Sequence, residues 1–127
     1  MVLGFKSQFQ DKILAGTKIH TVRQDPNNRW RRGNKINFAT GVRTKNYKEF
    51  KVGTCISTQE VFMTYSHVLE MSVGSNYLFG YPERLEFAQR DGFDTLEDFE
   101  AWFYPLIKAA PDGLYKAKLI HWTDYRY

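Results

Sequence analysis

At the junction of a predicted helix and a predicted strand stands the segment Gly16-Thr17-Lys18-Ile19-His20-Thr21-Val22-Arg23. The preceding stretch, from Phe9 to Leu14, carries apolar residues at helical spacing, and Gly16 is the residue type that most often follows a helix end. Ile19 to Arg23 is rich in β-branched residues and predicts a strand. The segment therefore puts an ammonium, a hydroxyl and a guanidinium at one junction, where an anionic or carbonyl-bearing ligand can be held.

Lys18 and Thr21 can act together only under one condition. In a regular strand, side chains alternate between faces, so two residues three positions apart point to opposite sides. They converge if Lys18 lies in the turn ahead of the strand, which Gly16 permits. One interpretation is acyl transfer, in which a lysine of lowered pKa takes the threonine proton. The other is a solvated lysine beside an ordinary strand threonine.

The rest of the chain predicts an α+β domain. Alternation and β-branched content favour five further strands, at residues 2–5, 35–40, 53–65, 68–73 and 115–122. Capping-box spacing occurs at Ser7/Gln10 and at Asp94/Glu97. A helix is expected from about 82 to 91, ended by Gly92, and a second one after Asp94 until Pro105 disturbs it. This order predicts a small mixed sheet or open barrel with helices outside it, as one domain spanning residues 1–127.

Charge is unevenly distributed along the chain. The net charge is +4, but residues 18–51 hold ten Lys or Arg against two acids, a local charge of +8. Residues 83–100 hold seven acids against two Arg, a local charge of −5. A basic third of this kind attracts a phosphate-bearing partner. The alternative is an ordinary surface whose two halves partly neutralise each other.

The basic third also contains an aromatic residue between guanidinium groups. Arginine binds phosphate bidentately, and an indole offers a stacking face worth roughly 1–3 kcal/mol per base. The residues in question are Arg23, Arg29, Trp30, Arg31 and Arg32, with Arg43 and Lys45 as an extension of the same groove. In the alternative interpretation Trp30 closes one end of the barrel and the arginines form a solvated rim.

Several classes of protein have no support in the sequence. A single cysteine, Cys55, excludes an internal disulfide, and no Cys/His spacing suits zinc or another metal. Motifs for nucleotide hydrolysis, dinucleotide binding, zinc proteases and serine hydrolases are absent, so no cofactor is expected. Without a leader-like start or an 18-residue apolar run, the chain is expected to be cytoplasmic and monomeric, with no membrane partner.

Three segments, taken together, resemble a known family. These are Phe9-x-x-x-Ile13-Leu14-Ala15-Gly16-Thr17-Lys18-x-x-Thr21-x-Arg23, then Ala88-Gln89-Arg90-Asp91-Gly92-Phe93 leading to Leu96-x-x-Phe99, and the closing Leu119-Ile120-His121-Trp122. In this order they resemble the ASCH domains, a branch of the PUA-like superfamily. The resemblance implies a PUA-like β-barrel with flanking helices and a cleft beside the Gly-x-Lys-x-x-Thr-x-Arg segment.

The resemblance implies two activities. One is RNA or nucleic-acid binding in the basic cleft. The other is hydrolysis of the amide of an acylated cytidine by a lysine, a threonine and a glutamate, which by position are Lys18, Thr21 and Asp91. The chain departs from that pattern, because Asp91 is one methylene shorter than glutamate. A shift of about 1 Å in a positioned group can cost ~10²-fold in rate, and Glu86 is the nearby alternative.

Three hypotheses follow. The favoured one is a cleft that binds RNA, another single-stranded nucleic acid or a nucleotide, with Lys18, Arg23, Arg31 and Arg32 on phosphate and Trp30 stacking. The second is an amidohydrolase of a modified nucleoside such as acetylcytidine, in which Lys18 accepts the Thr21 proton, Asp91 holds Lys18 and Arg23 steadies the oxyanion. The third is a non-catalytic module for an acidic protein partner.

Overall fold

The structure is a computed structural model that describes all residues from 1 to 127. Its eight strands are β1 Val2–Phe5, β2 His20–Arg23, β3 Lys35–Thr40, β4 Lys48–Thr54, β5 Ser57–Tyr65, β6 Leu69–Val73, β7 Asn76–Tyr77 and β8 Tyr115–His121. Its helices are α1 Gln10–Leu14, α2 Tyr81–Arg90 and α3 Leu96–Ala109, and short 3-10 turns cover Ser7–Phe9 and Pro111–Gly113. The chain is therefore an α+β protein, as the sequence predicts.

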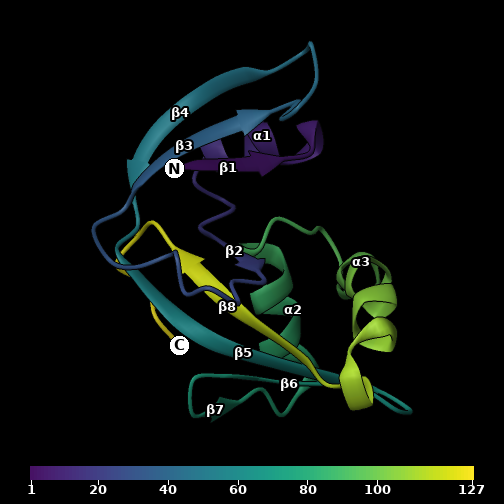
Figure 1. Cartoon of the computed structure of the whole chain (residues 1–127). Coiled ribbons are helices and arrows are strands. Elements are labelled where there is room, and N and C mark those ends of the chain that lie inside the picture. Colours follow the sequence, from purple (N-terminus) through teal and green to yellow (C-terminus); the bar gives the residue numbers. More distant parts are fainter.

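The strands form two sheets and no closed barrel. The smaller sheet has the order β1-β3-β4, with β1 parallel to β3 and β4 antiparallel to it. The larger sheet has the order β2-β8-β5-β6-β7 and is antiparallel throughout. Figure 1 shows the smaller sheet above the larger one, with the segments that lead from β1 to β2 and from β4 to β5 joining them. Strand β1 is consequently a free edge near the start of β2.

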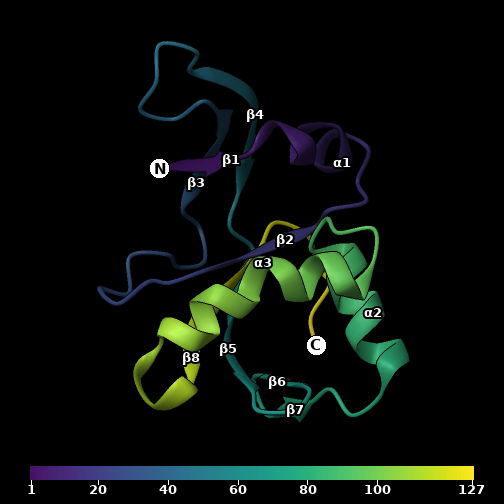
Figure 2. The same cartoon turned by 90° about the vertical axis from the view of Figure 1, so that its right-hand side faces the viewer.

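The helices cover the larger sheet on one side. Figure 1 shows α2 and α3 to the right of β5 and β8, and Figure 2, turned by 90°, shows α3 in front of those strands. Helix α3 buries Leu96, Phe99, Phe103 and Ile107, a stripe at helical spacing, and α2 buries Phe87 and Ala88. These side chains join the buried faces of both sheets in one apolar core.

Most expected elements are present close to their predicted bounds. Strands β1, β3, β6 and β8 and helix α2 agree with prediction to within one residue at each end. Strand β2 begins at His20, so Lys18 lies in the turn before it, as cooperation with Thr21 requires.

Other predicted details are wrong. The segment 53–65 is two strands, since β4 ends at Thr54 and β5 begins at Ser57. Neither capping box forms as expected: no side chain caps α1, and Thr95, not Asp94, caps α3 by accepting a hydrogen bond from the Asp98 amide at 3.1 Å. Pro105 does not end α3, which continues to Ala109.

Candidate functional site

Two glycine-terminated helix ends bring Lys18 and Asp91 together. At the end of α1 the amides of Gly16 and Thr17 donate to the carbonyls of Ile13 and Lys12, which is a Schellman motif. The end of α2 repeats this pattern, with Gly92 in the left-handed region at φ 100°. The Ile19 amide then donates to the Arg90 carbonyl at 2.9 Å, which joins the two turns.

The ammonium of Lys18 is buried and has three acceptors. Its Nζ donates to the His20 carbonyl at 2.8 Å, to the Asp91 carbonyl, and to Asp91 Oδ1 at 3.5 Å. Both side chains are 3% exposed. Because an ammonium has three protons, these three acceptors account for all of them. Lys18 Nζ makes no hydrogen bond with the Thr21 hydroxyl.

Burial lowers the pKa of Lys18 from 10.5 to about 8, against the opposing attraction of the Asp91 carboxylate. The guanidinium of Arg23 contributes further to the lowering. At neutral pH Lys18 is therefore mostly protonated, but a proton leaves it far more easily than it leaves an exposed lysine. The Asp91 carboxylate neutralises part of the positive charge of Lys18 and Arg23 at the cavity wall.

His20 contacts Asp91 at the same carboxylate oxygen as Lys18 does. Its Nδ1 lies 3.1 Å from Asp91 Oδ1, and its Nε2 lies 2.7 Å from the Tyr127 hydroxyl. Burial lowers the pKa of His20, so the ring is neutral at pH 7 and donates from one nitrogen only. This chain of polar contacts fixes the carboxylate that in turn fixes Lys18.

Thr21 and Arg23 follow on β2. The Arg23 guanidinium donates to the Gly4 carbonyl at 2.6 Å, and its Nε lies 3.4 Å from Thr21 Oγ1. Its carbon Cζ lies 4.9 Å from the Phe5 ring centroid. Arg23 therefore bridges β2 to the free edge of β1, with its charge directed between the two sheets.

These side chains line one cavity of about 290 Å³. Lys18, Thr21, Arg23 and Asp91 all contribute to its wall. The remaining lining residues are Gly4, Phe5, Lys6, Phe9, Val22, Gln24, Phe93, Trp102, Phe103, Leu106 and Tyr115. The cavity thus combines an aromatic wall with three cations against one carboxylate, which suits a planar ligand carrying negative charge or carbonyl groups.

Trp102 is a site residue that the sequence does not reveal. Its side chain is 37% exposed, and the rings of Phe9 and Phe93 hold it edge-on at centroid distances of 5.5 and 5.6 Å. The Nζ of Lys6 lies 5.4 Å from its ring centroid. The amphipathic pattern of α3 assigns Trp102 only to the margin of the apolar stripe. Its position at the cavity depends on how α3 packs against Lys6 and Phe9.

Trp30 does not have the position that a stacking role requires. It is 8% exposed and belongs to the apolar core, so its indole has no free face for a base. The prediction of stacking by Trp30 is wrong, and the alternative of a residue that closes one end of the fold describes it better.

The predicted basic groove is also divided. Of the predicted cations, only Lys18 and Arg23 line the central cavity. Arg29, Arg31 and Arg32 are exposed on the loop between β2 and β3, and Arg43 and Lys45 are exposed on the loop between β3 and β4. Glu86, considered as a substitute acid, is exposed and pairs with Arg90 at 3.6 Å, outside the cavity.

No group of three His, Cys, Asp or Glu side chains is placed to hold a metal ion. None of the helices is both long and apolar enough to cross a membrane. Comparison of the chain with models of protein families, with curated proteins and with solved structures finds no match.

Proposed function

We propose that this chain is an ASCH domain whose cavity between β1, β2 and α3 binds a nucleotide unit of RNA or another single-stranded nucleic acid. In this proposal Arg23 and Lys6 contact phosphate, Lys18 supplies a fixed positive field, and Trp102 stacks on the base. The architecture is then a PUA-like fold whose strands are divided between two sheets.

One observation carries the proposal. Three residues of the Gly-x-Lys-x-x-Thr-x-Arg segment, together with Asp91, 73 positions after Lys18, line the same cavity. Lys6 and Arg23 leave positive charge at its wall, and exposed Trp102 offers the stacking surface that Trp30 does not. Guanidinium and ammonium groups beside an aromatic ring are the usual chemistry of sites for single-stranded nucleic acids.

A binding titration tests the proposal. Fluorescence anisotropy of a labelled hexauridylate and competition by uridine monophosphate are measured at 50 and 200 mM salt. Neutralising two to three phosphates predicts roughly a tenfold loss of hexauridylate affinity across that range. The Arg23→Gln variant should bind at least ~10-fold more weakly. Absence of binding to both ligands at 50 mM salt contradicts the proposal.

Amide hydrolysis of an acylated nucleoside is a second candidate, favoured by the lowered pKa of Lys18. An amine with a pKa of about 8 loses its proton readily near neutrality, and Thr21 shares its cavity. The contacts of Lys18 oppose this role, because all three of its protons are directed at Asp91 and the His20 carbonyl. Neutral Lys18 must turn from these acceptors before it can take a proton from Thr21.

The hydrolase candidate is tested by incubation with acetylcytidine and detection of cytidine. Hydrolysis through Thr21 predicts that Thr21→Val abolishes turnover while the Lys18–Asp91 pair stays intact. If the native protein releases cytidine and Thr21→Val does not, the cavity is catalytic. If neither releases cytidine, hydrolysis of acetylcytidine is contradicted and the binding titration decides the role of the cavity.

A further inference from the structure

We infer that the ligand of this site is a strand of several nucleotides that lies along the free edge of β1, not a single nucleoside. The inference rests on the proposed function and extends it from one cavity to a path. The central cavity shares lining residues with two neighbouring cavities.

Two further cavities adjoin the central one along β1. A cavity of about 760 Å³ shares Gly4, Phe5 and Lys6 with it and continues to the β3–β4 loop. A cavity of about 410 Å³ shares Gln24 with it, and its wall includes Met1, Val2, Arg29 and the edge of the largely buried Trp30. The three hollows therefore follow the chain from Met1 to Ser7, with the Lys18–Asp91 pair beside the middle.

The size of this groove exceeds what one nucleoside fills. Seven residues in extended conformation span about 20 Å at 3.3 Å per residue. At the 3.4 Å spacing of stacked nucleotides that length holds about six, and fewer if the strand is splayed. A path for roughly three to six nucleotides follows, whereas a nucleoside occupies only the central cavity of about 290 Å³.

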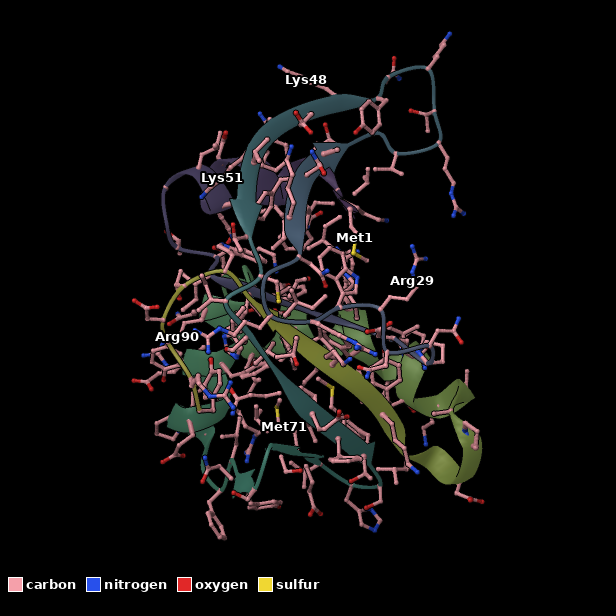
Figure 3. All side chains as sticks on the ribbon, turned by 60° about the vertical axis from the view of Figure 1, so that its left-hand side comes forward. Met1, Arg29, Lys48, Lys51, Met71 and Arg90 are labelled. Carbon is pink, nitrogen blue, oxygen red and sulfur yellow. The ribbon has the colours of Figure 1, made fainter.

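The charges along the groove suit a polyanion. Lys6, Arg23 and Arg29 stand at successive positions along it, and its two carboxylates are already paired, Asp91 with Lys18 and Asp25 with Lys118 at 2.9 Å. Figure 3 shows the Arg29 side chain beside Met1, at one end of β1. The Asp25 carboxylate also accepts a hydrogen bond from the Arg29 amide at 2.8 Å, which fixes the start of the loop between β2 and β3.

The basic side chains of β4 lie outside the groove. Lys48 and Lys51 project from β4, which β3 separates from β1 in the sheet order (Figure 3). Neither residue lines any of the three cavities. The path is therefore defined by β1 and not by the net charge of the basic third.

The test compares uridine oligomers of one, two, four, six and ten nucleotides at constant salt. Affinity should increase by at least 30-fold from one to about four to six nucleotides and then stay level. Equal affinity for the monomer and the hexamer overturns the path but leaves nucleotide binding intact. No binding of any length overturns both. Binding of polyglutamate as tight as that of the hexamer identifies an acidic peptide as the ligand and overturns the inference.

Variants locate the path. Arg29→Ala should weaken the hexamer three- to tenfold and leave the monomer unchanged, because Arg29 touches only the outer cavity. Lys6→Ala should weaken the hexamer similarly. Lys108→Ala is the matched control, since Lys108 also lies 5.4 Å from a ring of α3, that of Tyr104, but outside the groove. If Lys108→Ala weakens the hexamer as much as Lys6→Ala, binding follows overall charge and the path is wrong.

Discussion

The centre of the site is a buried ion pair between Lys18 and Asp91. Removing one partner from such a pair leaves an uncompensated charge in the interior, which commonly costs about 3–5 kcal/mol. The pair is nevertheless placed by backbone geometry, because two of the three acceptors of Lys18 are carbonyl oxygens. Lys18 therefore has a structural role in addition to the one proposed for it in ligand binding.

Lys18→Met is predicted to lower the free energy of unfolding by about 3 kcal/mol, because Asp91 then stays buried without its cation. The double variant Lys18→Met/Asp91→Asn should recover part of that loss, since neither partner keeps a charge. Urea denaturation measures both. Equal stability of Lys18→Met and the native chain would show that Asp91 is solvated and the pair unimportant.

The buried histidines predict a loss of stability in mild acid. Burial lowers the pKa of His121 from 6.5 to about 4, so the unfolded chain takes up a proton before the folded chain does. Stability from this group is present above pH 6.5 and is lost as pH falls toward 4, by up to about 3 kcal/mol. His121→Gln should flatten the decline in urea experiments between pH 6.5 and 4, whereas replacing exposed His67 should not. An unchanged decline in His121→Gln contradicts this assignment.

At the scale of elements, two helix ends decide where the site forms. Gly16 and Gly92 both adopt the left-handed conformation that follows a helix, with φ of 80° and 100°. The surroundings of the two glycines differ. A Cβ on Gly92 would lie 2.7 Å from Lys18 Cδ and 2.9 Å from Phe9 Cδ1, whereas a Cβ on Gly16 meets nothing within 4 Å.

Gly92→Ala should therefore destabilise the protein more than Gly16→Ala. Both variants bear the backbone strain of about 1–2 kcal/mol for an alanine in the left-handed region. Only Gly92→Ala adds a steric clash, which should make its total loss roughly 2 kcal/mol larger and displace Lys18. Thermal or urea unfolding of the two variants provides the comparison. Equal losses would mean that Gly92, in the turn after α2, does not lie as close to Lys18 and Phe9 as these distances require.

These elements also show which parts of the site can be predicted from the sequence. The two glycines at helix ends follow from local rules, whereas the position of Lys18 in the turn before β2 is only permitted by Gly16 and is established by the start of β2 at His20. The break between β4 and β5 at Cys55 and Ile56 follows Gly53, but a single glycine is also compatible with a bulge in one continuous strand. That break decides which residues belong to which sheet, so the two-sheet arrangement could not be predicted from local patterns.

At the scale of the whole molecule, summed charge is a poor guide to the site. The basic third, net +8 in sequence, is divided between the buried Lys18, strands β2, β3 and β4, and two loops. Trp102 and Lys6, which sequence reasoning missed, come from segments outside that third. Their proposed roles arise only when α3 packs against the segment from Lys6 to Phe9, a contact between parts of the chain far apart in sequence.

The most direct measurement is an NMR titration of the isotopically labelled protein with hexauridylate, followed through backbone amides and the Trp indole signals. We expect the shifts to concentrate on Gly4, Lys6, Arg23 and Arg29 and on the indole of Trp102, while the amides of Lys48 and Lys51 stay in place. Shifts confined to β4 and the β3–β4 loop, with the Trp102 indole unchanged, would contradict it.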